Sequence, residues 1–177
     1  LLLALIGTVM SGCANPSYTR TSPTLSNVNV SIVAILPFTG EEKYAALATE
    51  TFTLQMVGIK GVRIIQPEDV SLTIRRMGIS NSNEITVLEA KKVAKAMGAT
   101  AIVKGNASGY TNGVTLNGFS TVKLIDVKTG EIVAASHEPS GLLFAYSVEQ
   151  SVIAAVKNTA RIFRELIERH ATPHKPK

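Results

Sequence analysis

Residues 31–38 read Ser-Ile-Val-Ala-Ile-Leu-Pro-Phe, a continuous apolar run rich in β-branched side chains. Such a run predicts a strand that is buried on both faces, and Pro37 predicts its end because proline donates no backbone hydrogen bond. From residue 41 to about residue 57, apolar side chains recur at helical spacing, namely Ala45, Ala48, Phe52 and Met56. A buried strand followed by an amphipathic helix predicts an α/β domain.

The pattern downstream of this unit predicts further helices and strands. In chain order these are a strand at 62–65, helices at 67–78 and 85–97, strands at 101–106, 114–127 and 132–137, and a long helix from about 147 to 169. Residues 126–131 predict a tight hairpin turn, and Gly118 predicts a bulge or bend within the longest strand. The fold class expected is α/β (α+β), a single mixed β-sheet with helices packed on it in the order β-α-β-α-α-β-β-β-α. The first strands need helical crossovers, whereas the last ones can pair antiparallel.

The N-terminal stretch carries the pattern of an export signal. Residues 1–10, LLLALIGTVM, have no charge, and they are too few to cross a bilayer as a helix, which needs about 20 residues. They match the apolar core of a secretory signal, so residues 1–12 are expected to be a signal peptide that lacks its first residues. The sequence Met10-Ser11-Gly12-Cys13 resembles the bacterial lipobox. That resemblance implies that Cys13 receives a diacylglycerol thioether and becomes the mature N-terminus, and Ala14 after it implies the outer membrane.

The mature chain is expected to hold one domain. Residues 13–30 are interpreted as the lipidated cysteine and a flexible linker, because they are rich in Pro, Ser and Asn. Residues 31–169 form the α/β domain, and residues 170–177 a mobile tail. A coil of the linker's length averages roughly 20–25 Å end to end, so the domain is expected to lie close to the membrane.

Composition argues against several function classes. The net charge is +5, but the 18 basic residues come as singles and pairs, and only 5% of the chain is aromatic. Nucleic-acid binders usually combine a basic stripe with stacking aromatics, so no nucleic-acid partner is expected. Cys13 is the only cysteine, which excludes an intramolecular disulfide. The histidines, His137, His170 and His174, lack the ligand clustering of a metal site.

Three short motifs imitate those of penicillin-binding enzymes: Ser120-Thr-Val-Lys123, Tyr110-Thr-Asn112 and Lys128-Thr-Gly130. In those enzymes the serine and lysine lie one turn apart on a helix. Here they fall in a predicted strand, where positions three apart point to opposite faces. We therefore expect no catalytic residue, no cofactor-binding residue and no metal ligand, and the chain is interpreted as a non-enzyme.

Four stretches together resemble a known family. They are Val33-Ala-Ile-Leu-Pro-Phe38, Val62-Arg-Ile-Ile65, Val93-Ala-Lys-Ala-Met-Gly-Ala99 running into Ala101-Ile-Val-Lys-Gly105, and Val122-Lys-Leu-Ile-Asp-Val-Lys-Thr-Gly-Glu-Ile-Val133. Over residues 31–167 the chain is similar to the periplasmic domain shared by the curli-secretion lipoprotein CsgG, the penicillin-binding-protein activator lipoprotein LpoB and the N-terminal domain of TolB.

The resemblance implies a lipid-anchored outer-membrane protein that acts as a binding or assembly module of an envelope machine. It transfers no catalytic residues. Besides the membrane itself, the partners it implies are envelope proteins, with a second copy of the chain or a peptidoglycan synthase among them. The specific alternatives are an activator of a peptidoglycan synthase and a subunit of a curli-type secretion ring.

Overall fold

The strand predicted at residues 31–38 is β2 (Ile32–Ile35), in a computed structural model that describes residues 16–79, 85–140 and 145–171. β2 pairs in parallel with β3 (Arg63–Ile65) on one side and with β4 (Ala101–Asn112) on the other. Val33 and Ile35 are buried in one core cluster, and Ala34 in a second. Burial on both faces explains why the run shows no polar alternation.

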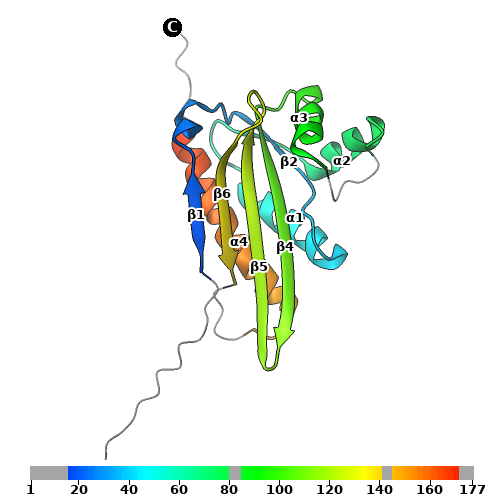
Figure 1. The fold of residues 1–177 in the computed structure, drawn as a ribbon, viewed down its shortest axis with the longest axis vertical. Helices are drawn as coiled ribbons and strands as arrows, with labels where there is room; N and C mark the ends of the chain where they lie inside the picture. Colours follow the sequence, from blue (N-terminus) through cyan, green and yellow to red (C-terminus); the bar gives the residue numbers. More distant parts are fainter. Residues whose placement is uncertain (1–15, 80–84, 141–144, 172–177) are drawn as a thin grey trace, which may run out of the picture.

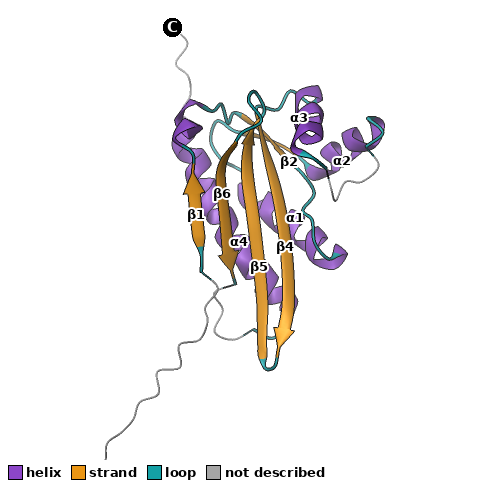
Figure 2. Cartoon of the chain, in the orientation of Figure 1, coloured by secondary structure: helices purple, strands orange, loops and turns teal. Residues whose placement is uncertain are grey.

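Four helices are described, and they lie on both sides of the sheet: α1 (Glu42–Met56), α2 (Pro67–Arg76), α3 (Val87–Ala96) and α4 (Val148–His170). Helices α1 and α4 cover one face, whereas α2 and α3 lie beside the β2 end of the other (Figure 2). Between β2 and α4, the described elements follow the predicted order, and the sheet is mixed as expected.

The antiparallel half of the sheet is built from β4, β5 (Thr115–Asp126) and β6 (Ile132–Pro139), which follow one another as hairpins. The strand order is β1-β6-β5-β4-β2-β3 (Figure 1). β4 continues to Asn112, six residues beyond the predicted end at residue 106. The β4–β5 hairpin is the longest element pair in the described sheet.

The bulge predicted at Gly118 is not there. Gly118 lies in regular register opposite Gly109, and the register shift falls between Leu124 and Ile125. Gly118 is needed for another reason, because a Cβ at this position would collide with the backbone of Ser151 in α4. The Ser151 hydroxyl donates to the Leu116 carbonyl at 2.9 Å, so α4 crosses β5 in direct backbone contact.

The flexible linker predicted over residues 13–30 is wrong from Tyr18 onward. Residues Tyr18–Thr21 form β1, which pairs antiparallel with β6 at the edge of the sheet, and Pro23–Asn27 form the short 3-10 helix η1. Leu25, Val28 and Val30 are buried in the core under α4 and α1. The domain therefore includes the residues from Tyr18 onward. The signal peptide (1–12), Cys13 and residues 172–177 of the predicted tail lie outside the described residues.

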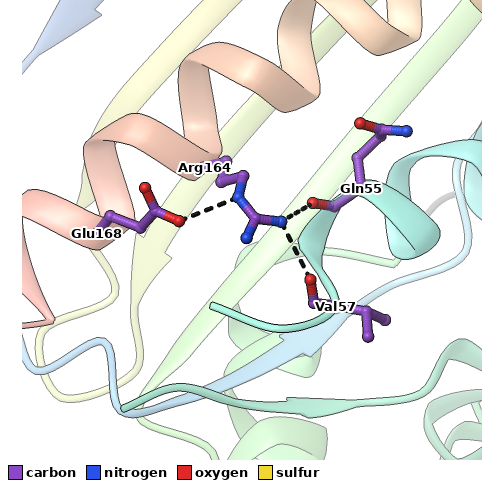
Figure 3. Close-up of polar contacts among 4 residues, drawn as sticks. All are labelled: Gln55, Val57, Arg164 and Glu168. Atoms are coloured by element: carbon purple, nitrogen blue, oxygen red, sulfur yellow. Dashed lines mark hydrogen bonds and ion pairs between the residues drawn. The ribbon is translucent and has the colours of Figure 1, made fainter. Parts of the chain in front are cut away.

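Arg164 fastens the two helices of the covered face to each other. Its Nη1 donates to the carbonyl oxygens of Gln55 (2.8 Å) and Val57 (3.0 Å), and its Nε donates to Glu168 at 3.0 Å (Figure 3). The carbonyls at the end of a helix have no partner within that helix. The guanidinium supplies partners to the end of α1 and thereby ties it to α4.

Candidate functional site

Half of one sheet face carries no helix. Strands β1, β6 and β5 and the distal part of β4 lie in front of α1 and α4, and nothing in the described chain covers them from the front (Figure 1). On the other half of this face, α2 packs mainly against β2, and α3 packs mainly against β4. We call this uncovered surface the open face.

Four ring side chains cross the open face from edge to edge, and we call them the aromatic stripe: Tyr18, His137, Phe119 and Tyr110. Consecutive ring centroids lie 5.3, 5.8 and 5.6 Å apart, with interplanar angles of 24°, 12° and 17°. Each ring comes from a different strand, from β1 through β6 and β5 to β4. Stacked rings at this spacing stabilise one another beyond the area that they bury.

The stripe is held in place but remains accessible. The hydroxyl of Thr121 lies 2.8 Å from Nδ1 of His137, which orients the imidazole. Phe119 and His137 are half-buried by their neighbours, whereas Tyr18 and Tyr110 at the two ends are 50% and 48% exposed. Large exposed aromatic rings gathered on one surface are a typical feature of binding sites.

A basic hollow of about 250 Å³ adjoins the stripe. Lys104 on β4 and Lys123 on β5 face each other directly across the ladder and both line the hollow. The Lys104 ammonium donates to the Ile85 carbonyl at 2.6 Å. Partial burial and then the charge of Lys123 lower the pKa of Lys104, against an opposing effect of Glu89. The remaining residues of the lining are Thr39, Val87, Gly105, Asn106, Thr121, Ile125 and Ile132.

The charge on the strands of the open face is positive. Arg20 lies two residues after Tyr18 on β1 and therefore on the same side. Together with Lys104 and Lys123 it gives this face three cations, while Asp126 and Glu138, the carboxylates within β4, β5 and β6, are both buried. The open face thus combines aromatic surface with positive charge.

The residues of the imitated catalytic motifs do not come together. Ser120 is fully buried on the helix-covered side, and its hydroxyl has no hydrogen-bond partner among the described residues. Lys123 lines the hollow on the opposite face, as strand alternation predicts. His137 belongs to the aromatic stripe, His170 has Nδ1 at 2.8 Å from the Leu166 carbonyl, and His174 lies outside the described residues.

Within residues 16–79, 85–140 and 145–171, no group of three or more His, Cys, Asp or Glu side chains is placed to hold a metal ion. None of the helices in these ranges combines the length and the apolar character needed to cross a bilayer. Cys13, the predicted lipidation site, is not among the described residues.

The sequence did not reveal the aromatic stripe. Its members are scattered from residue 18 to residue 137, and no local spacing joins them. Only the register of β1, β6, β5 and β4 places them in one row. Along β5, strand alternation places Phe119, Thr121 and Lys123 on one face.

No protein-family model matches the sequence, and no curated protein matches it. Solved structures do show similarity to this chain. The C-terminal domain of LpoB from Escherichia coli is 22% identical, covers 66% of this chain and 92% of that chain, and superposes with a TM-score of 0.50. A lipoprotein from Neisseria meningitidis is 15% identical over 74% of this chain and 98% of that chain, with a TM-score of 0.49. A PelC dodecamer from Paraburkholderia phytofirmans is 14% identical over 90% and 99%, with a TM-score of 0.43. The fold is therefore similar to that of the LpoB domain, which confirms the resemblance at the level of the fold.

Proposed function

We propose that this chain is a non-catalytic module, anchored by lipid on Cys13 to the periplasmic face of the outer membrane, that binds an envelope protein through its open face. The observation that carries the proposal is the aromatic stripe on a sheet surface that no described helix covers. Aromatic rings and arginine are enriched at protein interfaces, where they supply most of the binding energy. The open face has both, since Arg20 lies two residues after Tyr18 on β1.

The charge of the open face specifies the kind of partner. Lys104 and Lys123 lie opposite each other, and their repulsion is relieved when an acidic group approaches. A partner with an acidic, partly apolar surface is therefore attracted to this face and oriented on it. Binding by such a partner is expected to weaken as the salt concentration rises.

The experiment compares two single charge reversals that leave the core untouched. Lys123→Glu places a carboxylate on the open face, and Lys157→Glu makes the same change at an exposed position of α4 on the covered side. Crosslinked cell envelopes are used to recover the partner, and its affinity for each purified variant is then measured. We expect Lys123→Glu to weaken binding at least about ten-fold, or about 1.4 kcal/mol, and Lys157→Glu to leave it unchanged. Equal affinities of the two variants for the partner would mean that the partner does not bind through the open face.

A peptidoglycan synthase is a specific candidate partner, because the fold is similar to that of the LpoB domain. In that case the mature chain stimulates glycan polymerisation by the synthase in vitro. The stimulation is expected to fall with Lys123→Glu and to persist with Lys157→Glu. No stimulation at saturating protein would eliminate this candidate while leaving other envelope partners open.

A further inference from the structure

The β4–β5 hairpin carries exposed, uncharged surface at its turn. Val114 at the turn is 100% exposed, and Tyr110 on β4 is 48% exposed. The sequence from residue 105 to residue 122 contains no charged residue, although the chain has 18 basic and 13 acidic residues. We call residues 111–117 the hairpin tip.

Helix α4 begins beside this part of the hairpin. A Cβ on Gly109 would collide with Val148, the first residue of α4. Tyr146 lies two residues before that start and is 94% exposed. The exposed ring and the hairpin tip therefore belong to the same end of the molecule.

The N-terminus of the domain leaves at this end as well. Tyr18 lies opposite His137, and His137 lies opposite Thr121 of β5. From Thr121, β5 extends six residues further to Thr115, or about 20 Å, toward the tip. The start of β1 and the hairpin tip both point to the lower end of the view in Figure 1.

The reach of the anchor is shorter than this extension. Cys13 precedes Tyr18 by five residues, which span at most about 18 Å when fully extended. When the acyl chains of Cys13 enter a leaflet, Tyr18 therefore lies no further from that leaflet than the length by which the hairpin extends beyond the level of Tyr18. With the domain standing on its N-terminal end, the tip reaches the lipid.

We propose that the hairpin tip, together with Tyr146, rests in the headgroup layer of the leaflet that holds the Cys13 lipids. This inference rests on the lipidation stated under the proposed function. Tyrosine side chains favour this layer because the ring is apolar while its hydroxyl group is polar and can stay hydrated. The absence of charge spares the tip the cost that charged side chains meet near hydrocarbon. The contact holds the sheet upright, so the open face is presented to partners beside the membrane.

The test uses tryptophan as a depth probe, because the chain has none of its own. Val114→Trp places the probe at the hairpin tip, and Leu88→Trp places it on α3, where the native side chain is 63% exposed. Helix α3 lies at the opposite end of the sheet from the tip (Figure 1). Tyr146→Trp serves as a second probe at the membrane end.

Each variant, as the chain from Cys13 to Lys177, is coupled through its single cysteine to a maleimide lipid in phosphatidylethanolamine–phosphatidylglycerol vesicles. This chain contains every described residue. The vesicles carry lipids brominated near the carbonyl, which quench only probes in contact with them. We expect Val114→Trp and Tyr146→Trp to be quenched several-fold more strongly than Leu88→Trp, with blue-shifted emission.

Equal quenching of Val114→Trp and Leu88→Trp, on chains that float with the vesicles, would overturn the inference. Circular dichroism checks that the variants are folded, and these exposed sites need no repacking. Because the maleimide replaces cellular lipidation, this outcome is separate from a failure of Cys13 to be lipidated in cells. That failure would show up instead as a chain with an unmodified cysteine by mass spectrometry.

Discussion

At the residue scale, the carboxyl group of Asp126 organises the turn between β5 and β6. It accepts hydrogen bonds from the backbone of Lys128 (3.2 Å), from the backbone of Thr129 (2.9 Å) and from the Thr129 hydroxyl (2.8 Å). Burial by itself raises the pKa of Asp126, since the residue is only 8% exposed, but the Thr129 and Lys128 hydrogen bonds outweigh it and lower the pKa. These bonds favour the charged form and are lost when it is protonated.

Asp126→Asn is expected to lower the free energy of unfolding by about 1–2 kcal/mol at pH 7. Because the folded pKa is depressed, the carboxylate's contribution is fully present above its unfolded value of about 3.9 and is lost as the pH falls through the folded pKa. Urea denaturation at pH 7 and at pH 3 measures the effect. The difference in the free energy of unfolding between wild type and variant should be smaller at pH 3 than at pH 7. An identical difference at both pH values would contradict the assignment.

At the element scale, β1 and η1 turn an apparent linker into part of the fold. β1 exposes all of its side chains and lies at the sheet edge, so it lacks the apolar alternation by which strands are recognised. Its ladder with β6 links residues more than 110 positions apart, such as Tyr18 and His137. Leu25, 4% exposed, then adds an apolar side chain to the core beneath the helices.

A chain that starts at residue 31 is therefore expected to be less stable than one that starts at residue 16. Leu25→Ala alone should lower the free energy of unfolding by about 2–4 kcal/mol, because it leaves a cavity in the core. Ser26→Ala, at an exposed neighbouring position, is the matched control and should change little. Equal denaturation midpoints for the two chain lengths would mean that residues 16–30 add nothing to the folded state.

At the scale of the whole molecule, the anchor and the hairpin tip have unequal roles. Two or three acyl chains make an attachment effectively permanent, since each buried methylene contributes about 0.8 kcal/mol. The tip exposes one valine, and Tyr146 beside it exposes one tyrosine ring. This is enough to orient the domain but too little to retain it. Membrane residence is thus expected to depend on Cys13.

Cys13→Ser should release the chain from the membrane fraction, whereas Ser11→Ala, which keeps a small residue before the cysteine, should not. Fractionation of cell envelopes followed by mass spectrometry of the N-terminal peptide measures both location and modification. A Cys13→Ser chain that still sediments with membranes after a high-salt wash would count against a lipid anchor.

Local patterns predicted most elements between residues 31 and 169. Three examples are the run at 31–38, the helical spacing around Phe52 and the turn at Asp126. Each pattern spans only a few neighbouring residues, so it can be recognised in the sequence before the fold is known. Gly118 shows the limit of such reasoning. A glycine within the strand predicts a bulge or bend, but the feature that requires glycine here is the backbone of α4, some thirty residues later in the chain.

The sequence by itself determined the order of the elements from residue 31 onward, and it predicts an export signal ending at Cys13, because each depends on neighbours along the chain. The tertiary structure alone decided that residues 18–30 belong to the domain, that Tyr18, His137, Phe119 and Tyr110 form one row, and that the hairpin tip lies at the N-terminal end. The physical reason is strand register, which joins residues that are distant in sequence through hydrogen bonds common to every residue type.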